Sequence, residues 1–242
     1  MLSFQMETFG ILLLCALLPA GGNFIGSVLA DNVQTPKWIV GAALHGAAGV
    51  AIAVVSIDLM PRILPTTPTW VLAGTFVLGA AAALGMALLA RRIGGGRAWM
   101  VCVAVAADLT SDGLMAGVGA AVSSGLGLLI AISQSVANIP GGFAATASLE
   151  HDGVSRRARL WVAVLLATPA VISCGLGFWL LRDASPAVQN AALMVVAGLL
   201  LVATIEDVVP EGDASPRLPR WVSTAAFATG FVGLAVLSKY FR

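Results

Sequence analysis

The sequence predicts an all-α protein that crosses a membrane several times. Of its 242 residues, 59% are hydrophobic and only 10% are charged, and the mean hydropathy is +0.95. These proportions lie far from those of a soluble domain. Apolar stretches of about 20 residues, the length that a helix needs to cross the hydrocarbon core of a bilayer, recur along the whole chain. The net charge is +1, so no bulk charge favours a nucleic acid partner.

Eight stretches are apolar enough over a sufficient length to be membrane-spanning helices. In chain order they are Phe9–Ala30, Trp38–Met60, Trp70–Leu89, Trp99–Val122, Leu126–Leu149, Leu160–Leu181, Val188–Val209 and Trp221–Leu237. Short connections rich in Pro, Gly, Ser or Arg, such as "LPTTPT" and "EGDASPRLP", join them. No soluble domain is left over, so we expect a single transmembrane domain over residues 1–242.

The basic residues predict the orientation of these helices, because Lys and Arg are concentrated in cytoplasmic loops. If the amino terminus is outside, most of them lie in inner loops, including Arg91, Arg92 and Arg97 in one loop and Arg156 and Arg157 in another. We therefore expect eight spans with both termini extracytoplasmic.

Two of the predicted helices resemble each other. In the second stretch Asp58 is followed three residues later by Pro61, and in the seventh Asp207 is followed by Pro210 at the same distance. A glycine lies nine residues before each aspartate. Because the predicted topology makes these two helices run in opposite directions, the match indicates an inverted repeat, a transporter device in which related halves form alternate gates. Two unrelated helix ends that terminate at a proline are the alternative.

The fourth stretch carries two carboxylates, Asp108 and Asp112, near its middle. They are four residues apart and so lie on one helical face, one turn from each other. A charged side chain at the bilayer centre costs about 2.5 to 3.5 kcal/mol, so these acids should face the interior of the bundle. Gly113 and Gly117 permit the close approach of a neighbouring helix, which we expect to be the fifth stretch.

The fifth stretch contains the polar residues Ser133, Gln134, Ser135 and Asn138, followed by Pro140. We expect the proline to kink this helix and to free backbone carbonyls beside Asn138. Two carboxylates, an amide oxygen and free carbonyls together favour a hard, oxygen-rich cation site. A structural hydrogen-bond cluster between two helices, or a pair of acids that carries a proton, would use the same residues.

Four stretches carry a family resemblance. The fourth resembles the H-N-x-x-[DE]-G element, and the fifth the N-x-P-E-G element, of the ZIP (Zrt/Irt-like) divalent metal transporters. The second, "GVAIAVVSIDLMPR", and the seventh, "AGLLLVATIEDVVPE", are similar to the "GVxLAxxxxDLLPE" and "AGxxLxVxxxExIPE" helices of that family. Eight spans with outward termini also match its topology. The resemblance implies a ZIP-like bundle in the cell membrane that transports a divalent cation of the zinc, iron or manganese class.

The resemblance is less complete at the metal ligands than in the scaffold. Asp108 stands where the family has a His, and Asp112 and Asn138 stand at a second acid and an Asn, whereas Gly141 replaces a metal-bridging Glu. The resemblance therefore implies a depleted site that holds one metal through Asp108, Asp112, Asn138 and water. Without imidazole or thiolate, such a site shifts its preference from zinc toward magnesium, manganese or ferrous iron.

Other polar residues mark the two ends of the implied path. In this interpretation Asp58 lies at the outer mouth, and Glu206, Asp207 and Glu211 lie at the inner mouth. His45 is the only histidine inside a predicted span. It is either a metal ligand or proton acceptor near the exit or, as we favour, a histidine that joins two helices by a hydrogen bond.

The expected partners are the lipid bilayer, the transported divalent ion and a second copy of the chain, because ZIP-like proteins form homodimers. The protein is not expected to be an enzyme or to require a cofactor. Two other functions stay open. One is transport of another solute or of protons, with the acid pair as a proton relay; the other is a membrane scaffold that transports nothing.

Overall fold

The computed structural model describes residues 2–32, 36–92 and 97–240. These residues are almost entirely helical, and no strand occurs among them. The prediction of an all-α protein is therefore confirmed.

Seven segments of the described residues are long and apolar enough to cross a membrane. They are Gly10–Asn32, Trp38–Ile63, Thr69–Leu89, Ser124–His151, Arg156–Leu181, Pro186–Asp213 and Arg220–Ser238. Each overlaps one predicted stretch. Helix α5 (Arg97–Val122) covers the remaining stretch but is not among the seven, and it carries Asp108 and Asp112. These helices indicate a multi-pass membrane protein, and the count of eight spans stays a prediction.

The chain divides into two compact units. Unit 1 comprises Met1–Gln34 and Ala87–Asp183, and unit 2 comprises Thr35–Met86 and Ala184–Arg242. Each unit therefore combines segments that are far apart in the sequence. The single domain expected over residues 1–242 stays a prediction.

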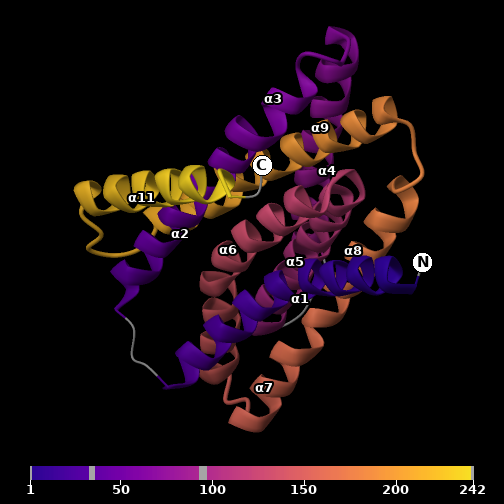
Figure 1. Ribbon diagram of the computed structural model, residues 1–242. Helices are drawn as coiled ribbons and strands as arrows, with labels where there is room; N and C mark the ends of the chain where they lie inside the picture. Colours follow the sequence, from indigo (N-terminus) through magenta and orange to yellow (C-terminus); the bar gives the residue numbers. More distant parts are fainter. Residues whose placement is uncertain (1, 33–35, 93–96, 241–242) are drawn as a thin grey trace. The chain divides into compact units, whose positions relative to one another are not determined.

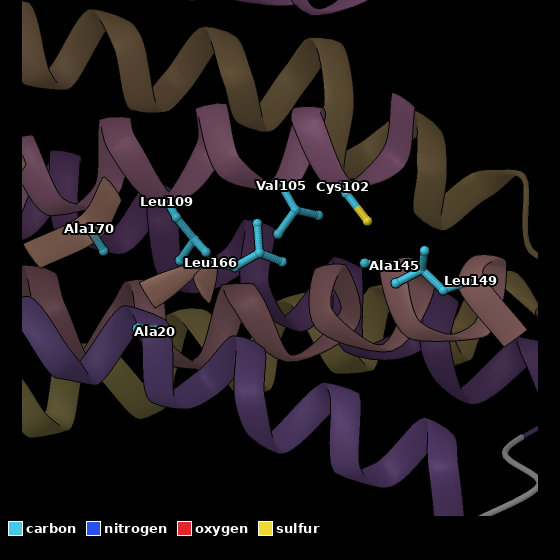
Figure 2. Packing of buried hydrophobic residues seen from close by; sticks show 8 residues of the cluster. All are labelled: Ala20, Cys102, Val105, Leu109, Ala145, Leu149, Leu166 and Ala170. Carbon is cyan, nitrogen blue, oxygen red and sulfur yellow. The ribbon is translucent and has the colours of Figure 1, made fainter. Parts of the chain in front are cut away.

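Unit 1 is built around a long helix from the start of the chain. Its helices are α1 (Leu2–Asn32), α5 (Arg97–Val122), α6 (Ser124–His151), α7 (Arg156–Leu165) and α8 (Ala167–Leu181). Helix α1 packs mainly on α6, and α5 packs on both α6 and α8 (Figure 1). The apolar cluster between them consists of Ala20, Cys102, Val105, Leu109, Ala145, Leu149, Leu166 and Ala170 (Figure 2).

The predicted sixth span is divided in the structure. Helices α7 and α8 meet at a turn at Leu166, three residues before Pro169. Because proline has no N–H, Pro169 cannot bond the carbonyl of Leu165, which is where α7 ends. The proline thus accounts for the interruption.

Unit 2 contains the helices that carry the two similar sequence motifs. Its elements are α2 (Lys37–Ala53), η1 (Val54–Leu59), α3 (Met60–Ile63), α4 (Thr69–Arg92, in this unit as far as Met86), α9 (Pro186–Ala203), η2 (Thr204–Val208), α10 (Val209–Asp213) and α11 (Arg220–Ser238). Helix α2 packs side by side with α11 (Figure 1).

The two similar motifs have the same local deformation. The π-helical turns η1 and η2 each end two residues before a proline, Pro61 and Pro210, respectively. The residue before each proline donates its N–H to the carbonyl five residues back. Single π turns inside α-helices insert one residue into the helical register. The sequence match between the second and seventh stretches is thus accompanied by a structural match.

The packing around these motifs also matches. Gly49 of α2 lies against the backbone carbonyl of Phe227 in α11, and Gly198 of α9 lies against the carbonyl of Phe76 in α4. In both pairs the glycine has no room for a methyl group, because a Cβ there would overlap the carbonyl oxygen. The pairs α2 with α11 and α9 with α4 therefore approach each other in the same way.

A second pair of matching contacts occurs in unit 1. Gly26 of α1 lies against the carbonyl of Ile139 in α6, and Gly177 of α8 lies against the carbonyl of Leu114 in α5. The reciprocal contacts join Gly142 to Asn23 and Gly117 to Cys174. The packing of α1 on α6 thus corresponds to that of α8 on α5. These matches agree with an internal repeat, and its inverted orientation stays a prediction.

Candidate functional site

A buried hydrogen bond joins α5 to α6 in unit 1. The side-chain nitrogen of Asn138 donates to Oδ2 of Asp112 at 2.5 Å and to the carbonyl of Gln134 at 2.9 Å. Asp112 is 3% and Asn138 is 1% exposed. The structure thus brings together two of the three residues predicted for the midplane site.

The hydrogen-bond inventory of Asn138 determines which of its atoms can bind a ligand. The NH₂ group has two hydrogens, and both have acceptors. The carbonyl oxygen, Oδ1, is buried and has no hydrogen-bond partner among the described residues. Its lone pairs are therefore available to a cation or to another donor.

The third predicted ligand, Asp108, differs from Asp112 in exposure. It lies one helical turn before Asp112 on α5, but it is exposed. Its backbone carbonyl accepts a hydrogen bond of 2.8 Å from the hydroxyl of Ser111. Asp112 is thus the buried acid of the pair, and the role of Asp108 as a metal ligand stays a prediction.

The expectation about the helix next to Gly113 and Gly117 is wrong. Both glycines lie against α8, where a Cβ at Gly113 would overlap the Ala170 carbonyl and one at Gly117 the Cys174 carbonyl. The reason is the helical repeat, since neighbouring residues point about 100° apart around the axis. Asp112 faces α6, and Gly113 therefore faces a different neighbour.

Helix α6 continues through Pro140 from Ser124 to His151. The kink and the freed carbonyls expected beside Asn138 stay a prediction. The backbone carbonyl of Gln134 lies next to Asn138 and accepts a hydrogen bond from its side-chain amide.

His45 joins two elements of unit 2. Its Nδ1 lies 2.9 Å from the carbonyl of Gly41, and its Nε2 lies 3.1 Å from a carboxylate oxygen of Asp213 at the end of α10. The interpretation of His45 as a histidine that joins helices by hydrogen bonds is confirmed. Both ring nitrogens have partners within the protein, so coordination of a metal would replace one of these contacts. His45 as a metal ligand stays a prediction.

The acids predicted for the two mouths of the path also lie in unit 2, in different surroundings. Asp58 on η1 is 1% exposed and accepts a hydrogen bond of 2.5 Å from the hydroxyl of Ser238 on α11. Glu206, Asp207 and Glu211, on η2 and α10, are exposed. The matching positions Asp58 and Asp207 therefore differ in burial.

The predicted site residues are thus divided between the two units. Asp108, Asp112 and Asn138 belong to unit 1, and His45, Asp58, Glu206, Asp207 and Glu211 belong to unit 2. Within the described parts of the chain, no group of three or more His, Cys, Asp or Glu side chains is placed to hold a metal ion. Any cation held in unit 1 would therefore need amide, hydroxyl, carbonyl or water oxygens as well.

Sequence reasoning missed two polar features of unit 1. Asn23 on α1 is 0% exposed, and neither its side-chain oxygen nor its nitrogen has a hydrogen-bond partner among the described residues. The signal was an asparagine inside an apolar span, which is typical of a functional or interhelical position. The second feature is the buried pair of Arg159 with Asp31, whose atoms approach to 2.5 Å.

No protein-family model matches this chain, and no curated protein matches its sequence. The long apolar helices define the class of the protein, which is a helical protein of the multi-pass membrane type. One of its two compact units contains a buried acid–amide pair.

Proposed function

We propose that this protein is a divergent ZIP-like transporter that moves a divalent cation across the cell membrane. The observation that carries the proposal is the buried pair of Asp112 and Asn138. A carboxylate withdrawn from water is costly unless it is paired with a positive group or well hydrogen-bonded. Asn138 supplies one strong hydrogen bond and keeps an oxygen available for a ligand.

In this proposal each residue of the pair has a distinct task. The carboxylate of Asp112 provides the charge that offsets dehydration of the ion, and Asn138 orients the carboxylate and adds its Oδ1 as a neutral ligand. Asp108, one turn away, adds the second negative charge. These are hard oxygen ligands, which suit magnesium, manganese or ferrous iron better than zinc. No covalent step and no resident cofactor is involved.

The ends of the path and the alternation between them belong to the same proposal. Asp58 would mark the outer mouth, with Glu206, Asp207 and Glu211 at the inner mouth. Related helices that form alternate gates are a general transporter design. The matched π turns η1 and η2, each before a proline, support this design. The basic loops favour eight spans with both termini outside, and the family resemblance favours a homodimer.

A second candidate function is transport of protons or of another solute. It is favoured by the lack of a group of three or more His, Cys, Asp or Glu side chains placed for a metal within the described residues. In that case Asp112 would carry a proton in place of offsetting the charge of an ion. A scaffold that transports nothing would need only the structural hydrogen bond.

Uptake into reconstituted vesicles tests the proposal. We expect the wild type to take up Mn²⁺, and we expect Asp112→Asn to lose uptake, because the variant keeps size and hydrogen bonding but removes the charge. Asp183→Asn is the matched control, since Asp183 is exposed and pairs with its neighbour Arg182. A pH-sensitive dye inside the vesicles measures proton movement. If the wild-type protein moves protons but no divalent ion, the second candidate function is established. If it moves neither, the interpretation as a scaffold that transports nothing remains.

A further inference from the structure

Among the described residues of unit 1, Asn23 on α1 is the most completely buried polar side chain that lacks a partner. It is 0% exposed, and both its Oδ1 and its Nδ2 are without a hydrogen-bond partner among the described residues. Buried polar groups are almost always satisfied by protein, water or a bound ion. An amide with both ends unsatisfied inside a helical bundle therefore points to a ligand.

The contacts of α1 with α6 place Asn23 close to the level of Asn138. Gly22, the residue before Asn23, lies against the carbonyl of Ser135, and the backbone of Asn23 lies against Gly142. Asn138 is in α6 between these two contact points, three residues after Ser135 and one turn before Gly142. The stretch of α6 that meets Gly22 and Asn23 thus brackets Asn138.

An apolar cluster lies close to these polar groups along the same helices. The core cluster of unit 1 contains Ala20, three residues before Asn23 on α1, and Leu109, three residues before Asp112 on α5 (Figure 2). Electrostatic interactions are stronger in such a region than in water, and an unsatisfied polar group there is correspondingly costly. It is therefore costly in free energy to leave Asn23 and the Oδ1 of Asn138 without a hydrogen-bond partner or a ligand.

We propose that Asn23 is a further ligand of the cation in unit 1, so that α1, α5 and α6 each contribute one oxygen-bearing residue: Asn23, Asp112 and Asn138. This inference rests on the proposed function, because it adds a ligand to the same site. The oxygen of Asn23 faces the ion, and its NH₂ group is free to donate to the carboxylate or to a coordinating water. The set of one buried carboxylate and two neutral amides suits a hard cation that keeps part of its hydration shell.

Magnetic resonance on the wild-type protein tests the inference directly. The chain has four asparagines, so selective ¹⁵N-asparagine labelling gives four side-chain amide signals. We expect Mg²⁺ to shift the signals of Asn23 and Asn138 with one common dissociation constant, and Mn²⁺ to broaden the same two. Asn32 and Asn190 are internal controls, because their amides already donate to the carbonyl of Val28 and the hydroxyl of Thr66, respectively.

Variants at Asn23 give a second test, because a metal ligand and a purely structural amide predict opposite results. Asn23→Leu should weaken Mn²⁺ binding at least about tenfold, as expected for loss of a ligand, and should melt higher than the wild type without the ion, because it removes an unsatisfied buried amide. Asn23→Asp should bind Mn²⁺ more tightly. Asn190→Leu is the matched control and should leave binding unchanged. An amide that only joins helices predicts the reverse for Asn23→Leu, a lower melting temperature with unchanged binding.

The outcomes separate this inference from the proposed function. If Mg²⁺ shifts Asn138 but not Asn23, and Asn23→Leu binds Mn²⁺ normally, Asn23 is not a ligand while the cation site of Asp112 and Asn138 stands. If no divalent ion shifts any of the four signals, the proposed function is wrong and Asn23 is satisfied by water alone. Should the Asn23 variants fail to fold, the wild-type spectra still decide.

Discussion

The hydroxyl of Ser238, near the end of α11, donates a hydrogen bond of 2.5 Å to the carboxylate of Asp58 on η1, and both residues are 1% exposed. The bond ties the π-helical turn of the second span to the helix with which α2 packs. Sequence inspection marked Asp58 as an acid at the mouth of a path, and the structure adds the partner that holds it.

Ser238→Ala should lower the free energy of unfolding by about 1 to 3 kcal/mol, because it leaves a buried carboxylate with one hydrogen bond fewer. Denaturant titration in detergent measures the change. Ser223→Ala on the same helix is the control, since that hydroxyl is exposed and bonds the carbonyl of Arg220 on its own helix. It should change stability by no more than about 0.5 kcal/mol. Equal effects of the two variants would show that the Asp58 contact contributes nothing.

Arg159→Met should destabilise unit 1 by about 1 to 3 kcal/mol, because Asp31 loses its nearer charge partner and keeps the more exposed Arg156 at 3.7 Å. The side chain of Asp31 is 0% exposed and that of Arg159 is 10% exposed. Adding Asp31→Leu to the variant should recover most of the loss, since an apolar pair needs no compensation. As a surface control, Asp183→Ala should cost less than about 1 kcal/mol. A double variant no more stable than Arg159→Met alone would contradict this account.

Gly142→Ala and Gly117→Ala should each cost about 1 to 3 kcal/mol, because the added methyl group meets a backbone carbonyl of the facing helix. The two positions correspond in the matched pairs α1 with α6 and α8 with α5, so their effects should be similar. Gly21→Ala is the control, since nothing lies within 4 Å of its Cβ position, and it should be neutral or slightly stabilising. Thermal unfolding measures all three. If Gly117→Ala did not change the stability, the two matched helix pairs would not be equivalent in packing energy.

The basic loops predict that the two ends of the segment Arg156–Leu181 lie on opposite sides of the membrane. In a background without Cys15, Cys102 and Cys174, Asp152→Cys should react with an impermeant maleimide only from the cytoplasmic side, and Asp183→Cys only from outside. Both positions are exposed. Labelling with the sides exchanged would reverse the orientation and exclude extracytoplasmic termini.

The helical class and the positions of the long helices could be predicted from the sequence because hydropathy and length decide them. Pairing could not. Gly113 and Gly117 signalled a close neighbour, but their spacing does not say which helix supplies it, and the structure gives α8. Asp112 and Asn138 were expected to lie together on neighbouring spans, and the structure joins them by a hydrogen bond.

Residues with partners far along the chain were the hardest to predict. Asp213 meets His45 and Ser238 meets Asp58 across most of the sequence, and no local pattern marks either contact. For Asn23, the only signal in the sequence was the position of an asparagine inside an apolar span. Its lack of a hydrogen-bond partner among the described residues became evident only from the structure.

The division of each unit between distant segments has a consequence for biosynthesis. A nascent chain that has been made as far as Leu181 contains every helix of unit 1, so this unit can assemble while the ribosome is still working. Helix α2 is translated well before its partner α11, because α5 to α8 of unit 1 lie between them in the sequence. Until α11 is made, the glycine face of α2, with Gly49, is without the helix that covers it. Unit 2 therefore completes its packing later than unit 1.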